Sequence, residues 1–220
     1  MPNLSVNLNK VALIRNSREG NLPDLLRAAR VVIDCGCQGL TLHPRADARH
    51  ATLKDVADFS RIPEVRSGQV EFNIEGDLRK DLLTAAKQAH AQQFTVVPVM
   101  PGEKTSSRGW SGQDDQQALR DCIAFFEGKT RISVFCDATE ESVTLAAEAG
   151  AQAVEFYTGD YARQFALGQA DSVLAQLKHA AAIAQAANMR VHGGHDLNTE
   201  NLALYLQTVP THEVSIGHAI

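Results

Sequence analysis

The sequence predicts an α/β protein folded as one (β/α)8 barrel of the TIM type over residues 1–220. Strand-like runs alternate with helical patterns along the whole chain, and they number eight, which is the strand number of this barrel. Two of the runs, LSVNLN at 4–9 and VEFNIE at 70–75, are apolar on one side only. Strands of an open doubly wound sheet are apolar on both sides, whereas the inward side chains of a barrel can be polar near its catalytic end. The barrel is therefore favoured over the open sheet.

Each unit of the first half pairs a short strand-like run with a longer helical stretch. Asp24, which follows Pro23, marks the start of the first helix. The strands are expected at 4–9, 39–44, 70–75 and 94–99, and the helices that follow them at 23–35, 52–60, 78–90 and 113–127.

The second half repeats this form. Thr139 marks the start of a helix and Gly150 its end, since helix C-termini prefer glycine. The strands are expected at 131–137, 153–159, 190–195 and 213–218, and the helices at 139–149, 169–187 and 198–206. The sequence ends at Ile220, so the final closing helix of the barrel is absent from it. We expect that either the protein continues or a neighbouring subunit covers the eighth strand.

The strand at 70–75 has two faces of different chemistry. In the barrel, its apolar side chains point at the helices and its polar side chains point inward. The outward residues are Val70, Phe72 and Ile74, and the inward residues are Glu71, Asn73 and Glu75. Glu75 is the last of the inward residues before the turn at Gly76, so we expect it at the catalytic end and the two deeper residues paired within the barrel.

Composition excludes several classes of partner. The chain has a formal net charge of −5 and a pI of about 5.9, with acidic and basic residues spread along it. Without a basic run that follows a phosphate backbone, nucleic acid is not expected as a partner. No apolar run approaches the roughly 20 residues that span a bilayer, and the N-terminus lacks a signal-peptide pattern. We therefore expect a cytoplasmic protein with no membrane partner.

Chemistry-bearing residues collect where the predicted strands end. The active sites of such barrels lie at the C-terminal ends of the strands and in the loops that follow. Five of the eight histidines fall on these positions. Because histidine titrates near neutral pH, several histidines that converge with carboxylates can exchange protons repeatedly with one substrate. The residues concerned are Asn7, Asn9, Lys10, His43, Arg45, His50, Glu75, Thr105, Asp137, Glu155, Thr158, His192, His195, Asp196, Gly217 and His218.

The same residue types also occur in metal-binding and phosphate-binding sites. Histidines and carboxylates also bind zinc or iron, but the sequence contains no H-x-H, H-E-x-x-H or C-x-x-C pair, so a metal is not expected. Phosphate binding is suggested by HGGHD at 192–196 and SIGHA at 215–219, together with the forked donors of Arg18 and Arg45. Glycine pairs also occur in ordinary turns, so both readings of these loops stay open.

Six stretches, taken together and in this order, resemble the pyridoxine 5'-phosphate synthase family of the deoxyxylulose-dependent vitamin B6 pathway. The resemblance runs over nearly the whole chain, and the combination of H-P-R-x-D-x-R-H, G-H-D-L and S-I-G-H-A is specific. The stretches are VNLNKVALIRNSR (6–18), TLHPRADARH (41–50), FNIEG (72–76), VEFYTGDYA (154–162), GGHDLNTEN (193–201) and EVSIGHA (213–219).

The resemblance implies a (β/α)8 enzyme that uses no cofactor and no metal. It would condense 1-deoxyxylulose 5-phosphate with 3-amino-1-hydroxyacetone phosphate and release phosphate and water. By position, His43 and Glu75 resemble proton acceptors, His195 a proton donor and Glu155 a stabiliser of charged intermediates. Arg45, His50 and Thr105 resemble contacts to the deoxyxylulose phosphate, and Asn7, Arg18, Gly217 and His218 resemble contacts to the aminoketone phosphate. Family members assemble as homo-oligomers, commonly octamers.

Three positions depart from the best-known members of the family. Asn9 and Lys10 stand in place of Asp-His, and Asp196 stands where a glycine follows the proton donor. We count all three as substrate-binding residues. Lys10 can pair with a substrate oxygen or phosphate, and Asp196 can orient His195 or bind a substrate amine or hydroxyl. The alternatives kept open are another phosphosugar epimerase or aldolase and a catalytically divergent barrel that only binds a phosphorylated metabolite.

Overall fold

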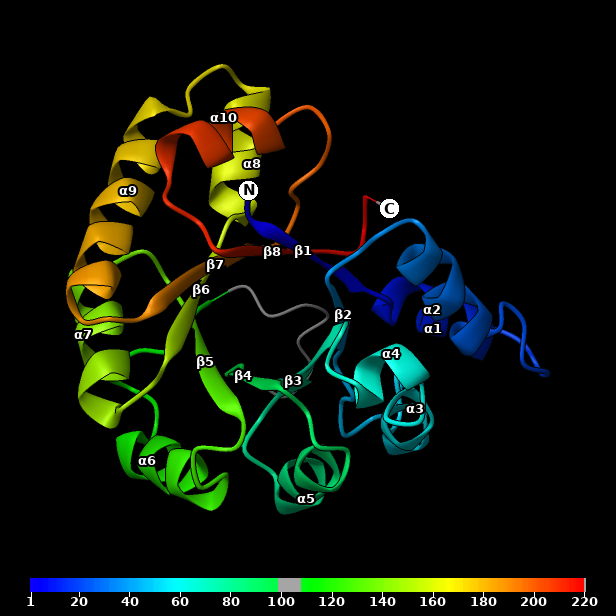
Figure 1. Cartoon of the computed structure of the whole chain (residues 1–220). Helices are drawn as coiled ribbons and strands as arrows, with labels where there is room; N and C mark the ends of the chain where they lie inside the picture. Colours follow the sequence, from blue (N-terminus) through cyan, green and yellow to red (C-terminus); the bar gives the residue numbers. More distant parts are fainter. Residues whose placement is uncertain (99–107, 220) are drawn as a thin grey trace.

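The computed structural model describes residues 1–98 and 108–219 and contains a closed barrel of eight parallel strands, ordered β1 to β8 (Figure 1). Every predicted strand is present, and the last strand pairs with the first, so the barrel prediction is confirmed. The strands are β1 (Asn3–Asn7), β2 (Gly39–Leu42), β3 (Glu71–Gly76), β4 (Gln93–Val96), β5 (Arg131–Cys136), β6 (Ala153–Tyr157), β7 (Arg190–Gly194) and β8 (Glu213–Ile216).

The helices form the outer ring in Figure 1. All seven predicted helices are present, and the described ranges contain three more, α1, α4 and α8, so the predicted number was too low. The helices are α1 (Asn9–Asn16), α2 (Leu25–Asp34), α3 (Leu53–Phe59), α4 (Pro63–Arg66), α5 (Lys80–Gln88), α6 (Gln116–Phe125), α7 (Glu140–Ala149), α8 (Gly159–Ala166), α9 (Asp171–Ala186) and α10 (Leu202–Thr208). None of the helices described is long and apolar enough to cross a membrane.

The first strand is shorter than predicted. It ends at Asn7, and α1 begins at Asn9, so Asn9 and Lys10 open a helix instead of closing or following a strand of six residues. The side chain of Asn7 accepts a hydrogen bond from the Asn9 amide at 3.0 Å, which satisfies one of the free N–H groups at the helix start. The side chains at this strand end are therefore held by a tight turn.

The predicted helix boundaries rest on the capping interactions that the sequence indicated. The Asp24 carboxylate accepts from the Arg27 amide at the start of α2, and the Thr139 hydroxyl accepts from the Ser142 amide at the start of α7. Gly150 ends α7 with φ of 92°, a left-handed conformation that glycine adopts without steric cost.

The barrel interior is polar, as the alternation in β3 predicted. Ser5, Thr41, Asn73 and Thr95 are buried and form a chain of hydrogen bonds from β1 to β4. The distances along the chain are 2.7 Å between the Ser5 and Thr41 hydroxyls, 3.3 Å from Asn73 Nδ2 to Thr41 and 3.1 Å from Thr95 to Asn73 Oδ1. Because each of these four buried side chains has a partner, this part of the interior avoids the cost of unsatisfied hydrogen-bonding groups.

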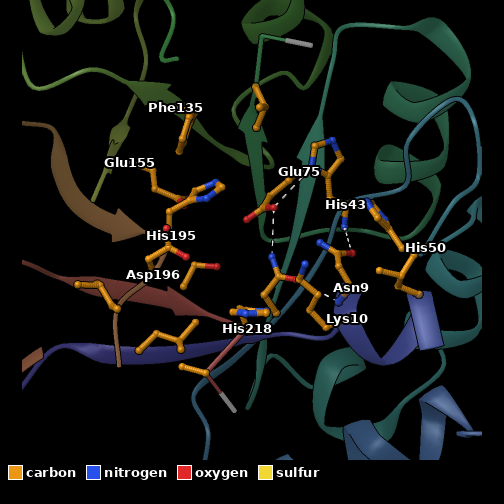
Figure 2. A pocket seen from close by; sticks show the side chains of 18 of the residues that line it. Asn9, Lys10, His43, His50, Glu75, Phe135, Glu155, His195, Asp196 and His218 are labelled. Atoms are coloured by element: carbon orange, nitrogen blue, oxygen red, sulfur yellow. Dashed lines mark hydrogen bonds and ion pairs between the residues drawn. The ribbon is translucent and has the colours of Figure 1, made fainter. Parts of the chain in front are cut away.

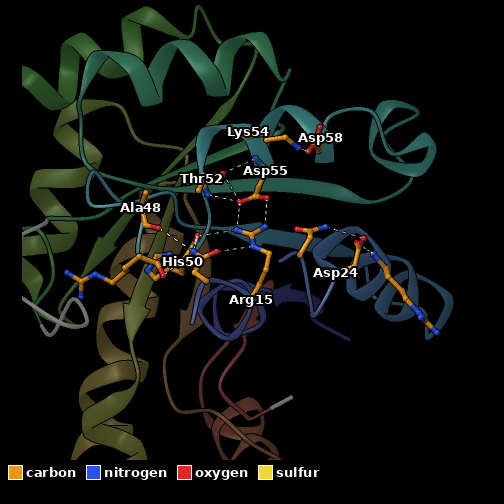
Figure 3. A network of polar contacts seen from close by, with 12 residues as sticks. Arg15, Asp24, Ala48, His50, Thr52, Lys54, Asp55 and Asp58 are labelled. Carbon is orange, nitrogen blue, oxygen red and sulfur yellow. Dashed lines mark hydrogen bonds and ion pairs between the residues drawn. The ribbon is translucent and has the colours of Figure 1, made fainter. Parts of the chain in front are cut away.

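Helix α1 anchors the long loop that follows β2 (Figure 3). The Arg15 guanidinium binds both oxygens of Asp55, at 2.6 and 3.0 Å, and both residues are buried. Asn16 Nδ2 donates to the His50 carbonyl oxygen at 2.7 Å. The Thr52 side chain caps α3 reciprocally with Asp55. The loop from Arg45 to His50 is thereby fixed against α1 at the mouth of the barrel.

Candidate active site

A cavity of about 650 Å³ lies at the C-terminal ends of the strands (Figure 2). Residues from all eight strands or from the loops after them line it, which is the expected location of a barrel active site. Twelve of the fourteen residues predicted for the site line this cavity: Asn7, Asn9, Lys10, His43, Arg45, His50, Glu75, Glu155, His195, Asp196, Gly217 and His218.

Among the other strand-end residues, Asp137, Thr158 and His192 do not line the cavity. Two residues predicted to bind substrate are also absent from the twelve. Arg18 is exposed in the segment after α1 and does not line the cavity. Thr105 lies outside the described residues.

Glu75 and His43, the two residues expected to accept protons, are neighbours in the cavity. Glu75 Oε2 lies 3.9 Å from His43 Nδ1 and accepts a hydrogen bond from Asn7 Nδ2 at 3.3 Å. Burial raises the pKa of Glu75 to about 7, against the opposing hydrogen bonds from Ser215 and Asn7. A carboxyl group with a pKa near neutrality is suited to accept and return protons.

His43 is neutral in this environment. Its burial lowers its pKa well below the ordinary value, and the positive charges of His50 and Arg45 lower it further. Its Nε2 atom is buried and has no hydrogen-bond partner among the described residues, and the same holds for His50 Nδ1. The two rings meet edge to face, with centroids 5.8 Å apart. Unpaired buried nitrogens at a cavity wall are suited to receive a ligand.

Glu155 is a second carboxyl group that burial keeps protonated. Burial raises the pKa of Glu155 well above its ordinary value, and the nearby charges of Glu75 and Glu213 raise it further. Gly194 on the adjacent strand makes room for this side chain, since a Cβ atom at Gly194 would lie 2.1 Å from Glu155 Oε1. The cavity therefore holds two carboxyl groups with raised pKa values, one of them near 7.

His195 is held in an aromatic frame. Its ring centroid lies 5.3 Å from those of both Phe135 and Tyr157. Burial lowers the pKa of His195, the Asp196 carboxylate opposes this, and the Lys10 ammonium adds to it. The lowered pKa favours the neutral imidazole, whose N–H group can donate to a carbonyl oxygen. A phosphate dianion bound nearby favours its protonation.

Two asparagines at and just after the end of β1, Asn7 and Asn9, line the cavity and also make structural contacts. Asn9 Oδ1 accepts from the His43 amide at 2.8 Å, so Asn9 holds the start of the loop after β2. A Cβ atom at Gly217 would lie 2.5 Å from the Asn7 carbonyl oxygen, so only glycine fits beside Asn7 at this end of β8.

The cavity also has a cationic side. Lys10, Arg45 and Arg49 line it, and Arg49 donates through Nε to Asp47 at 2.7 Å. Guanidinium and ammonium groups are the usual partners of phosphate.

Some residues that line the cavity were not predicted from the sequence. On the strands they include Phe135, Tyr157 and Ser215. Alternation along each strand would have found them, because each lies two residues from a position already considered, namely Asp137, Glu155 and Gly217.

The arrangement offers little to a metal ion. In residues 1–98 and 108–219, no three His, Cys, Asp or Glu side chains are grouped closely enough to hold one. The prediction that the reaction uses no metal and no cofactor stays a prediction.

The fold and the cavity together define a (β/α)8-barrel enzyme whose candidate site contains buried carboxyl groups and imidazoles. The model of one protein family, described as Pyridoxal phosphate biosynthesis protein PdxJ, matches residues 4–220. The chain belongs to this family.

Curated relatives agree with this assignment over nearly the full chain. A protein of Xanthomonas axonopodis pv. citri (strain 306), named pyridoxine 5'-phosphate synthase, is 43% identical over 99% of this chain and 88% of its own length. A protein of Albidiferax ferrireducens with the same name is 39% identical over the same shares of the two chains.

Solved structures show the fold alone. The 3-keto-L-gulonate-6-phosphate decarboxylase of Vibrio cholerae has a TM-score of 0.68 at 13% identity, covering 98% of this chain and 88% of that one. A phosphoribosylanthranilate isomerase of Thermotoga maritima has a TM-score of 0.57 at 10% identity, covering 99% of this chain and 87% of that one. Both similarities are consistent with the closed barrel.

Proposed function

We propose that this chain is a pyridoxine 5'-phosphate synthase, which condenses 1-deoxyxylulose 5-phosphate with 3-amino-1-hydroxyacetone phosphate. The observation that supports this most strongly is the convergence of His43, Glu75, Glu155 and His195 on one cavity that also has a cationic side. Family membership and the names of the curated relatives support the same reaction. The alternatives of an epimerase, an aldolase or a silent binding barrel have no such support.

The reaction requires several proton transfers at neighbouring atoms. Attack of the amine on the ketone, dehydration to an imine, loss of phosphate and aromatising deprotonation each move a proton. Glu75 and His43 are the proposed acceptors, because a carboxyl group with a pKa of about 7 is partly ionised at neutral pH and the imidazole is neutral. The two groups lie 3.9 Å apart. His195 is the proposed donor to the leaving oxygen. Glu155 is proposed to stabilise cationic intermediates by releasing its proton when positive charge develops beside it.

The two substrates are proposed to bind on different sides of these groups. Arg45 and His50, on the loop that α1 anchors, are proposed to bind the phosphate of the deoxyxylulose substrate, together with Thr105. Asn7, Gly217 and His218 are proposed to bind the aminoketone phosphate, with Arg18 closing over it from the segment after α1. Lys10 and Asp196 also line the cavity, where they are proposed to pair with a substrate phosphate and a substrate amine respectively.

Product formation by the purified protein tests this function. The protein is mixed with the two substrates in the presence of a chelator, and pyridoxine 5'-phosphate and inorganic phosphate are measured. We expect stoichiometric formation of both, with no increase on adding divalent metal. A folded protein that binds both substrates but forms no product, with or without metal, would contradict the proposal. Borohydride trapping distinguishes an aldolase, whose Schiff base would form on a lysine such as Lys10, the lysine that lines the cavity within the described residues.

We also propose that the protein works in the cytoplasm as a homo-oligomer, an octamer as the resemblance to the family implies. The exposed apolar side chains on α1 and α2 support an interface there: Leu13 is 40% exposed, Ile14 60%, Leu26 43% and Val31 55%. Sedimentation of the purified chain tests the oligomeric state. Replacement of Ile14 and Val31 by lysine should dissociate the oligomer, and an unchanged sedimentation coefficient would exclude this interface.

A further inference from the structure

The turn that carries His195 has an unusual backbone. His195 and Asp196 are consecutive residues with φ of 84° and 57°, both in the left-handed region, and neither is glycine. A bulky residue reaches this region only when its surroundings hold it there. The contacts that hold this turn therefore decide where the imidazole points.

Thr158, the residue directly after β6, supplies most of these contacts. Its hydroxyl lies 2.7 Å from the Gly194 carbonyl oxygen and 2.5 Å from that of His195, and it donates to this pair of acceptors. Its backbone amide donates to the Gly194 oxygen at 2.9 Å. Strands β6 and β7 pair up to Tyr157 and Gly194, so the Thr158 hydroxyl extends the contact between them by one step, into the turn.

The orientation of the Thr158 side chain is informative, because another role is available to it. Thr158 occupies the N-cap position of α8, where a threonine hydroxyl usually accepts a hydrogen bond from the first turn. The side chain makes no capping hydrogen bond to α8. Its hydroxyl is turned instead toward the carbonyl oxygens of the neighbouring strand end.

A second buried side chain holds the other end of the same turn. Asn201 Nδ2 donates to the Asp196 carbonyl oxygen at 3.0 Å, and Asn201 is only 2% exposed. The Asn201 carbonyl oxygen in turn accepts from the Tyr161 hydroxyl of α8 at 2.7 Å. The turn is thus fixed at both ends by groups outside the cavity.

We infer that Thr158 is a positioning residue for His195: its hydroxyl fixes the left-handed turn so that the imidazole lies in the aromatic frame and faces the cavity. Thr158 itself has no exposed surface and does not line the cavity, so it acts through the backbone of the turn and does not touch substrate. The inference rests on the proposed function in one respect, the role of His195 as proton donor.

Three variants test the inference. Thr158→Val removes the hydroxyl and keeps the shape, whereas Thr158→Ser keeps the hydroxyl. Thr130→Val is the matched control, because the buried Thr130 hydroxyl also donates to a backbone carbonyl, that of Ala91 at 2.8 Å, but at the opposite end of the barrel. We expect Thr158→Val to lower kcat about tenfold or more with KM nearly unchanged, since a displaced catalytic group slows the chemical step. Thr158→Ser and Thr130→Val should keep kcat within about twofold of the original chain.

Several outcomes would overturn the inference: a normal kcat for Thr158→Val, an equally low kcat for Thr158→Ser, or an equal loss in Thr130→Val. If the valine variant does not fold, Thr158→Ala lacks the same hydroxyl and takes its place. If the original chain forms no product, the proposed function fails, and the inference is tested by NMR titration of the His195 ring, assigned with His195→Asn. The His195 resonance should then shift in Thr158→Val and not in Thr130→Val, and an unshifted resonance would overturn the inference.

Discussion

The Nδ1 atom of His43 lies 3.9 Å from Oε2 of Glu75, and each of these side chains is only 11% exposed. His43 directly follows β2 and Glu75 belongs to the adjacent strand β3, so the register of the barrel itself brings them together. Because burial raises the pKa of the carboxyl group to about 7 and lowers that of the imidazole, a partly ionised carboxylate faces a neutral imidazole at neutral pH. A proton taken from substrate by either group can be passed to the other as the reaction proceeds.

Replacement of Glu75 by glutamine should lower kcat by about two orders of magnitude or more, the usual effect of removing a positioned base. The amide keeps the shape of the side chain but cannot accept the proton. Glu71→Gln is the matched control, since Glu71 lies on the same face of the same strand and pairs with Arg131 at 2.9 Å, away from the cavity. Steady-state kinetics on both variants checks this, and a normal rate for Glu75→Gln would remove the base from the mechanism.

Replacement of His195 by asparagine should reduce turnover on a similar scale, about a hundredfold, because the amide cannot deliver a proton to the leaving oxygen. The control is His212→Asn. In the original chain, His212 Nδ1 accepts from the Val191 amide at 3.1 Å near the start of β7, whereas His195 follows the end of this strand. Product formation under saturating substrate measures both. Equal losses in the two variants would indicate damage to β7 and no specific role for His195.

The acid limb of the kcat/KM profile should follow Glu75, whose pKa is about 7. A base acts only when ionised, so activity should fall as the pH drops through that value. Ser215→Ala removes a hydrogen bond that favours the ionised form, which raises the pKa of Glu75 further and moves the limb to higher pH. The control is Ser133→Ala, which removes another buried hydroxyl of the barrel, one without a hydrogen-bond partner in the described chain. Profiles that coincide for all three proteins would assign the limb to another group.

Replacement of Arg15 by methionine should destabilise the fold by about 3 kcal/mol, because it leaves the buried Asp55 carboxylate without its partner. Lys54→Met removes an exposed partner of Asp58 on the same helix and should change stability by no more than about 0.5 kcal/mol. Denaturant unfolding measures both. A loss for Arg15→Met as small as that for Lys54→Met would mean that this ion pair does not anchor the loop after β2.

The barrel could be predicted because its signals are long-range regularities. Eight strand-like runs with polar inward faces leave few other architectures, and the residues at strand ends converge once the barrel is known. The missed helices are short, between four and eight residues for α4, α1 and α8, and α8 begins at Gly159, a poor helix former. Their formation depends on packing against the barrel, which local propensity does not report.

The fine geometry of the site lay beyond sequence reasoning. Nothing in the letters His195-Asp196 indicates two left-handed residues in succession, since this conformation is imposed by Thr158 and Asn201 from other segments. Asn9 was predicted from its position alone. Its hydrogen bond from the His43 amide depends on where β1 ends and α1 begins, which the sequence did not indicate. Which residues line the cavity could therefore be predicted better than the contacts that they make there.

The closure of β1 against β8 has a consequence for how the protein is made. The partners of the Glu75 carboxylate come from the first and last strands, Asn7 and Ser215, while Glu75 itself belongs to the third. A ribosome releases these strands far apart in time, and such non-local contacts form late in folding. An unfinished chain can contain the base but not its tuned environment. Activity should consequently arise in a single step during biosynthesis, when the eighth strand joins the first.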